Sequence, residues 1–392
     1  MRVLKQIWNF EITTEQAAKF TWLPVLIIIL SAGYIAMELL ILPSLPEFLT
    51  VSEFKDYLNQ NDADKNNTVL ILFVSLLIIT FLTRQFVSVY GFFIKSKITN
   101  RALVYRSFLV YTTSGIIGLA ASIVLLLAGG LIFLASGYSF ADGAMFITKT
   151  ETYLSAGISR YIPTLFVTHS KILALLLTLT VYSFTAYFMH YLTHVSRFLW
   201  HVAHGPHHLP EFLHPIGVPL AFTFDIVLLL PKIISMAVLS KLFYTEPLIL
   251  EMGIYSLLMY NFEIFNHTTV HYNFIRKYAL LRFLTQFFGG HGAYHYVHHS
   301  SAKEHQMANL GGGMFLVWDR IFGTFVDPPV QPPAIGWTNN PAIYMNPLRV
   351  IFGGPARIIY ELRMNKNWKT RFLILFGPIN YEPEISINYI KK

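Results

Sequence analysis

The chain has 392 residues, of which 54% are hydrophobic and 13% charged, with no cysteine and a formal net charge of +8. An ordinary soluble domain carries about 25% charged residues, so this composition favours a protein embedded in a lipid bilayer. The lack of cysteine excludes disulfides, thiolate-ligated haem and all-cysteine iron–sulfur clusters. We interpret the positive charge as affinity for anionic lipid headgroups rather than for nucleic acid.

About six apolar stretches follow one another along the chain, and each is suited to crossing a hydrocarbon core of ~30 Å as a helix. The predicted spans are residues 20–42, 68–83 (which can extend to 93), 107–135, 172–189, 216–243 and 248–265. The last two form a predicted hairpin around the turn at residues 244–247. The sequence therefore predicts an all-α fold, a polytopic membrane helical bundle of about six spans.

The charges of the loops orient these spans. The loop at residues 43–67 carries five acidic residues and two lysines, whereas the next loop, before the third span, carries five basic residues and no acid. Because Lys and Arg are enriched in cytoplasmic loops, that second loop is predicted to be cytoplasmic. Alternation from there places His190 and His267, at the ends of the fourth and sixth spans, on the cytoplasmic side. Every histidine cluster then reaches the cytoplasmic membrane face.

Histidine is unusually concentrated, because 14 of the 15 histidines lie between His190 and His305. Ten of them form two H-x-x-x-H pairs and two H-x-x-H-H triples. These are His190 and His194; His204, His207 and His208; His267 and His271; and His295, His298 and His299. We interpret all ten as metal ligands.

The spacing of these histidines has a physical reason. Helical residues three or four apart share one face, so the imidazoles of each pair can converge on one point. In each triple the last two rings point about 100° apart, so one triple can reach two metals. Ten ligands are too many for one ion with ~4–6 positions, whereas two ions account for them. A catalytic zinc site typically needs three protein ligands, so this set favours a redox metal and oxygen chemistry.

Ligating histidines usually donate their second ring N–H to a carboxylate or a carbonyl. Glu263 lies four residues before His267 on the same helical face, and Asp225 is a second acid within a predicted span, where burial is costly. Three further candidates for this supporting role are Asn266, His291 and Asp319. His291 also precedes His295 by four residues and is a candidate ligand.

The histidine pattern resembles that of the fatty acid hydroxylase/sterol desaturase superfamily of integral-membrane di-iron enzymes. The similarity covers roughly residues 165–330 and is carried by three segments and by Trp200, which lies one residue further from His204 than the resemblance implies. The segments are His295-Tyr-Val-His-His-Ser300, Asn309-Leu-Gly-Gly-Gly313 and Trp318-Asp-Arg-Ile-Phe-Gly-Thr-Phe325. In the tail, Asn346-Pro347-Leu348 and Phe376-Gly377-Pro378 resemble the branch similar to alkylglycerol monooxygenase.

This resemblance implies a four-helix membrane core and a cytosolic, histidine-rich cap that holds two iron ions. It also implies dioxygen as oxidant, an external electron donor, and hydroxylation or desaturation of a lipid such as a fatty acyl chain, a sterol or a glyceryl ether. The sequence contains no G-x-G-x-x-G motif, so we expect electrons to come from a redox partner and not from a nucleotide cofactor bound by this chain.

Two other functions are compatible with a histidine-rich membrane protein. A zinc-dependent membrane hydrolase would contain zinc and work without oxygen. A metal transporter or sensor would place its ligands at the middle of the bilayer, whereas these histidines lie at the ends of spans.

We divide the chain into an N-terminal membrane region of unknown role (1–160), a catalytic domain (161–330) and a tail on the membrane surface (331–392).

Overall fold

The computed structural model describes residues 9–19, 101–137, 153–208, 232–262, 269–288, 292–311, 315–336 and 346–383, with some isolated positions besides. Every regular element in these ranges is a helix, and the pairing between strand-like residues is limited to one antiparallel bridge, Ser300 to Ile335. The predicted all-α class is therefore confirmed for the described part of the chain.

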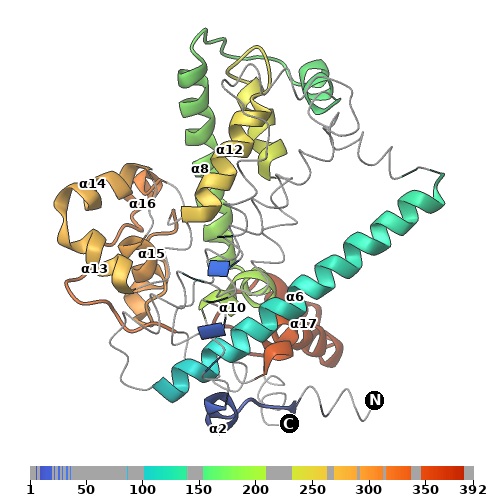
Figure 1. Ribbon diagram of the computed structural model, residues 1–392, viewed down its shortest axis with the longest axis vertical. Helices are drawn as coiled ribbons and strands as arrows, with labels where there is room; N and C mark the ends of the chain where they lie inside the picture. Colours follow the sequence, from blue (N-terminus) through green and yellow to red (C-terminus); the bar gives the residue numbers. More distant parts are fainter. Residues whose placement is uncertain are drawn as a thin grey trace.

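Helix α8, Lys171–Val195, carries the first pair of histidines and sets the position of the site (Figure 1). The side chain of Ser170 caps its start by accepting a hydrogen bond from the Leu173 amide, at 3.3 Å. Its 25 residues give a length of about 37 Å, enough to cross a bilayer. By length and composition, α8 is the one helix among the described residues that qualifies as a membrane span. The backbone turns to an extended conformation at Ser196, which ends the helix just beyond His194.

The other predicted spans are described only in part. Helix α6, Arg101–Ala135, is continuous over the third predicted span, and α12, Ile249–Phe262, lies within the sixth. The fifth is described from residue 232 onward, and the first two lie outside the described residues apart from isolated positions. The bundle of six spans and its separation from a cap therefore stay predictions.

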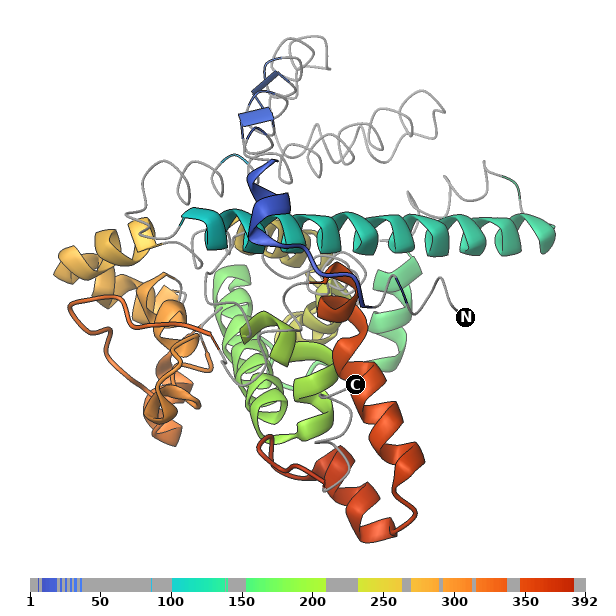
Figure 2. The same ribbon diagram turned by 90° about the horizontal axis from the view of Figure 1, so that it is seen from below.

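Short helices follow α8 and form the surroundings of the histidines. The chain continues through α9, Arg197–Leu199, the π-helix η3, Trp200–His204, and α10, Gly205–His208. A second unit contains five further short helices, which lie together beside α8 (Figures 1 and 2). They are α13 (Thr269–Lys277), α14 (Ala279–Phe288), α15 (Ala293–His298), η5 (Lys303–His305) and α16 (Val317–Phe322). The buried side chains of Tyr272, Tyr296 and Val297 form the core of this unit.

The C-terminal helices lie on the other side of α8 and α10 from that unit (Figure 2). They are α17, Pro347–Met364, and α18, Trp368–Phe376, and an asparagine side chain caps the start of each. The N-terminal helix α2, Thr14–Ala18, packs against α6 and the start of α17. A Cβ atom at Gly354 of α17 would collide with the carbonyl oxygen of His201, so glycine permits the close approach of α17 to η3.

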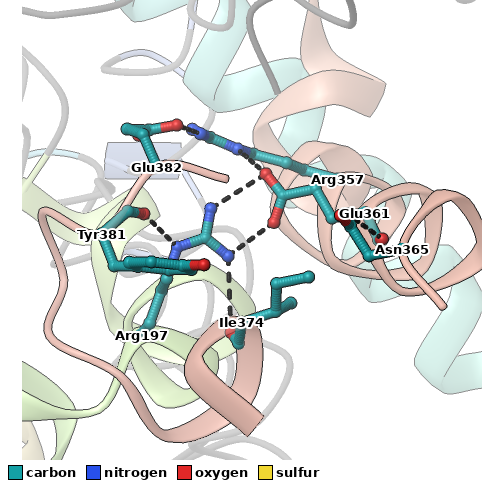
Figure 3. A network of polar contacts seen from close by, with 7 residues as sticks. All are labelled: Arg197, Arg357, Glu361, Asn365, Ile374, Tyr381 and Glu382. Carbon is teal, nitrogen blue, oxygen red and sulfur yellow. Dashed lines mark hydrogen bonds and ion pairs between the residues drawn. The ribbon is translucent and has the colours of Figure 1, made fainter. Parts of the chain in front are cut away.

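A fully buried ion pair fastens the C-terminal helices to the segment that carries the histidines (Figure 3). The guanidinium of Arg197, at the start of α9, donates two hydrogen bonds to the carboxylate of Glu361 on α17, at 2.6 and 2.9 Å. Its Nε donates to the carbonyl of Tyr381 at 2.7 Å, and Arg357 donates to Glu361 at 2.9 Å. Such a bidentate pair fixes orientation, because both planar groups must align.

Replacing Glu361 with glutamine should destabilise the protein strongly, because the buried Arg197 guanidinium then loses its counter-charge. Breaking a buried pair in this way costs about 3–5 kcal/mol. The exposed pair of Glu11 and Arg349, 3.1 Å apart, provides the control, and Glu11→Gln should cost at most about 1 kcal/mol. Chemical denaturation of the detergent-solubilised variants measures both, and equal losses would contradict the role given to the buried pair.

Candidate metal centre

Eight of the ten predicted ligands come together in two groups of side chains. In each group, one ring nitrogen from every histidine lies within 4.8 Å of the others. The first group has five histidines: His190, His194, His204, His208 and His298. The second group has three: His207, His295 and His299. Each triple divides between the two groups, which is the division that the spacing of three and four residues predicts.

The buried ring of His194 lies at the middle of the five-histidine group. Its centroid is 5.2 Å from that of His190, 4.8 Å from those of His204 and His298, and 4.9 Å from that of His208. The five side chains come from the end of α8, from η3 and α10, and from α15. The end of α8 and the η3–α10 segment are near in sequence, and the distant helix α15 meets them at one buried point.

The three-histidine group lies directly beside the first. The ring of His299 stacks on that of His208 with centroids 4.4 Å apart, and it contacts His207 at 4.2 Å. His207 and His208, neighbours in sequence, point into different groups with centroids 5.4 Å apart. The two groups thus form one continuous cluster of imidazoles, as a pair of adjacent metal ions would require.

The nitrogen spacing in both groups fits metal coordination. The Nε2 atom of His204 lies 2.9 Å from that of His190 and 2.9 Å from that of His208, and the Nε2 atoms of His295 and His299 are 3.0 Å apart. Two imidazole nitrogens bound roughly 2.0–2.1 Å from one ion at right angles would lie about 3.0 Å apart. The observed separations match this value.

Backbone carbonyls orient two of the rings by accepting a hydrogen bond from the nitrogen that faces away from the cluster. His190 donates from Nδ1 to the carbonyl of Leu310 at 2.5 Å, and His298 donates from Nδ1 to that of Ala308 at 2.8 Å. This directs each Nε2 towards the other histidines. The Nε2 of His298 is buried and has no hydrogen-bond partner among the described residues. Such an atom is costly to bury alone, and a bound cation would satisfy it.

Asp319, one of the candidates for a supporting role, holds the loop that supplies these carbonyls. Its carboxylate accepts hydrogen bonds from the amides of Leu310 and Gly311, at 2.6 and 2.8 Å, and from the Thr324 hydroxyl at 2.6 Å. Asp319 is fully buried, and burial raises the pKa of its carboxyl while these hydrogen bonds lower it. It therefore supports His190 through the Leu310 backbone rather than by touching the ring.

Asn309 fixes the same loop from its other side. It has a left-handed backbone with φ of 52°, a conformation that asparagine tolerates better than most residues. Its side-chain amide donates to the carbonyls of Tyr294 and Val326, at 3.1 and 2.9 Å, and its side-chain oxygen accepts from the Val326 amide at 2.9 Å. The Asn309 and Asp319 segments noted in the sequence thus form one scaffold behind His190 and His298.

The π-helix η3 accounts for the wide spacing of Trp200 and His204. A π-turn closes through an i→i+5 hydrogen bond, here from the Gly205 amide to the Trp200 carbonyl, and it holds one more residue than an α-turn. The Trp200 ring is buried, stacks on His208 with centroids 5.2 Å apart, and contacts His194 at the same distance. Trp200 therefore closes one side of the five-histidine group and excludes water from it.

Burial favours the neutral form of three clustered histidines. It lowers the pKa of His204, His208 and His298 well below the usual 6.5, and the charges of neighbouring imidazoles lower it further. His201, which lies outside both groups, has its pKa lowered to about 3 by burial and then by the charges of Arg357 and Arg197. Neutral imidazole is the form that binds divalent metals, so these three rings are able to act as ligands at neutral pH.

Of the remaining candidates, His271 is the one that lies among the described residues, and it is not part of either group. The ring of His271 packs against Gly292 at the start of α15, where a Cβ atom would lie 2.5 Å from its Cδ2. Its ring nitrogens do not belong to either set of nitrogens that lie within 4.8 Å of one another. The other candidates, whose roles stay predictions, lie outside the described residues: His267, Glu263, Asp225, Asn266 and His291.

Fold and site together define a helical protein whose two adjacent histidine groups are suited to a pair of metal ions. Residues 175–324 match the family model described as fatty acid hydroxylase, which confirms the predicted resemblance to that superfamily over this segment. All eight clustered histidines, and the scaffold of Asn309 and Asp319, lie inside the match. Comparisons with curated proteins and with solved structures gave no match.

Replacing Asp319 with alanine should weaken metal binding by roughly 10–100-fold, the usual cost of losing a partner behind a metal ligand. The reason is that the amides of Leu310 and Gly311 lose their acceptor, and the carbonyl that orients His190 is released. Competition against a chelator measures this affinity. Trp318→Phe is the matched control, since its indole donates to Ser183 on α8 and not to the loop. Unchanged affinity in Asp319→Ala would refute the scaffold.

Proposed function

We propose that this protein is a membrane-bound di-iron oxygenase that uses dioxygen and external electrons to hydroxylate or desaturate a lipid. The observation that carries the proposal is the pair of adjacent histidine groups within the segment that matches the fatty acid hydroxylase family. The family and the cluster fit a lipid hydroxylase; the metal, the oxidant and the substrate class are the proposed parts.

The donor set supports two iron ions over zinc. Imidazole binds iron, copper, nickel and zinc, but a catalytic zinc ion typically takes three protein ligands and leaves one position for water. Five clustered imidazoles in one group and three in the next exceed that need. Bound iron would supply the oxidising power to remove hydrogen from an unactivated C–H bond with dioxygen, which no side chain of this cluster provides alone.

The chain's own contribution is to position the reacting carbon and exclude water. The histidines lie at the end of α8, so a lipid lying along this apolar helix reaches them from the bilayer. The buried ring of Trp200, which stacks on His208 and contacts His194, covers the cluster from the protein side. Excluding water protects a reactive centre from side reactions and strengthens electrostatic interactions within it.

The setting of the enzyme follows from the same reasoning. We propose an integral membrane protein that crosses the bilayer several times, with the histidine clusters on its cytoplasmic face, where a soluble or membrane-bound redox partner can deliver electrons. The candidate substrates are fatty acyl chains, sterols and glyceryl ethers. The tail segments at residues 346–348 and 376–378, similar to the alkylglycerol monooxygenase branch, support including the ethers.

The purified full-length protein should contain about two iron ions per chain and should insert one atom of ¹⁸O₂ into a lipid, or remove two hydrogens from it, when reductant is supplied. Metal analysis and lipid mass spectrometry of cells with and without the gene check the two parts separately. Zinc in place of iron, together with a lipid product formed without oxygen, would establish the hydrolase alternative instead.

His298→Ala and His207→Ala should each abolish this activity while leaving the protein in the membrane, because each removes a ligand from one of the two groups. His305→Ala is the control: its ring hydrogen-bonds to Ser300 at 2.9 Å and belongs to neither group. Retained turnover in either ligand variant would count against the proposal, as would equal loss in the control.

A further inference from the structure

Helix α14 is amphipathic, but its apolar face is exposed and its polar face is turned towards the protein, the opposite of a surface helix in a soluble protein. Its exposed face carries Leu280, Phe283 and Leu284, with exposed fractions of 67%, 56% and 36%, at helical positions i, i+3 and i+4. Its polar side chains point into the protein instead. The Gln286 amide donates to the Tyr294 hydroxyl at 2.6 Å, and Arg282 donates to the carbonyl of Arg276. Exposed apolar faces of this kind mark contact with a partner or a membrane.

Helix α16 extends this surface to the membrane-span candidate. Ile321 and Phe322 are 61% and 54% exposed. The Phe322 ring stacks on Tyr187 of α8 with centroids 5.4 Å apart, and it lies 6.2 Å from Phe184, itself exposed on α8. The apolar surface of α16 is therefore continuous with the exposed apolar side chains of α8.

Two hydrogen bonds join α16 to α14. The Leu316 amide donates to the Gln286 carbonyl at 3.1 Å, and the Arg320 guanidinium donates to the Gln286 side-chain oxygen at 2.5 Å. These bonds hold the two helices in a fixed relation. The views in Figures 1 and 2 both place this unit beside α8. We name the exposed side chains of Leu280, Phe283, Leu284, Ile321 and Phe322 the apolar ledge.

Position along α8 shows how deep the ledge lies. Phe322 contacts α8 at residues 184 and 187, which precede His190 and lie about 12–17 Å from the C-terminal end of the helix. If α8 crosses a hydrocarbon core of ~30 Å, this level lies in the leaflet on the side of the histidines. It is closer to the bilayer midplane than the histidines are. The ledge then faces acyl chains rather than water.

The charge around the ledge suits anionic headgroups. Residues 269–288 contain no acid, and two basic side chains of this unit, Lys277 on α13 and Arg320 on α16, are exposed. The Arg320 guanidinium lies 3.7 Å from the centroid of the Phe325 ring, and Lys277 packs over Tyr278. Cationic and aromatic side chains together are typical of the membrane interface.

We propose that the apolar ledge inserts into the bilayer leaflet that contains the C-terminal half of α8, with an anionic phospholipid membrane as its partner. The histidine-bearing unit is then partly immersed in lipid and does not stand above the surface as a cap. A lipid moves from the leaflet to the cluster without crossing water. This proposal rests on α8 spanning the membrane and is independent of the metal chemistry.

The absence of cysteine makes a direct test possible, because a single introduced cysteine carries the only spin label. Phe283→Cys and Ile321→Cys, labelled with a nitroxide, are measured in the full-length protein in vesicles of mixed phosphatidylcholine and phosphatidylglycerol. Power-saturation electron paramagnetic resonance compares collisions with oxygen, which concentrates in lipid, against collisions with a water-soluble nickel chelate. Both positions should favour oxygen, as should the reference Val181→Cys on α8.

The aqueous reference is Glu304→Cys, on the exposed helix η5, which should favour the nickel chelate. Labels at 283 and 321 that behave like the label at 304 would overturn the proposal. Shielding of both labels from both reagents would also overturn it, because a second copy or another protein would then cover the ledge. A water-accessible label at 181 would remove the membrane span on which the proposal rests. None of these outcomes depends on iron or on lipid oxidation.

Discussion

Eight imidazole rings can share one buried volume only if something other than water satisfies their nitrogens. Burying an unpaired polar group costs free energy, and here the rings lie so close that they also oppose one another's protonation. Some nitrogens find backbone carbonyls, as in His190 and His298, while the Nε2 of His298 finds none among the described residues. A pair of cations would satisfy these buried nitrogens. The loop and the helices around the cluster hold the rings in position to bind them.

Support for the cluster comes from two sides. On one side, Asp319 and Asn309 fix the loop whose carbonyls orient two rings. On the other, the buried pair of Arg197 and Glu361 fixes α17 against the turn between α8 and η3 (Figure 3). Both supports join segments far apart in the sequence. The positions of the histidines therefore depend on the tertiary fold as well as on helical spacing.

The sequence could predict what depends on local spacing. Residues three and four apart share a helix face, so the division of each triple between two groups was accessible from the pattern alone. The Arg197–Glu361 pair was not, because its partners are 164 residues apart and no local periodicity links them. The carbonyls of Ala308 and Leu310 are backbone atoms without a side-chain signature, and Asp319 was identified as a supporting residue without its route through the loop. The ring of His271 packs against Gly292, and because its predicted partner His267 lies outside the described residues, its role as a ligand stays a prediction.

The central claim is that the two histidine groups hold two iron ions. Anomalous X-ray scattering from crystals of the full-length protein, recorded on both sides of the iron absorption edge, tests it most directly. The account predicts two iron peaks, one among His190, His194, His204, His208 and His298, and one beside His207, His295 and His299. A single peak, peaks at the zinc edge alone, or metal bound away from these rings would contradict it.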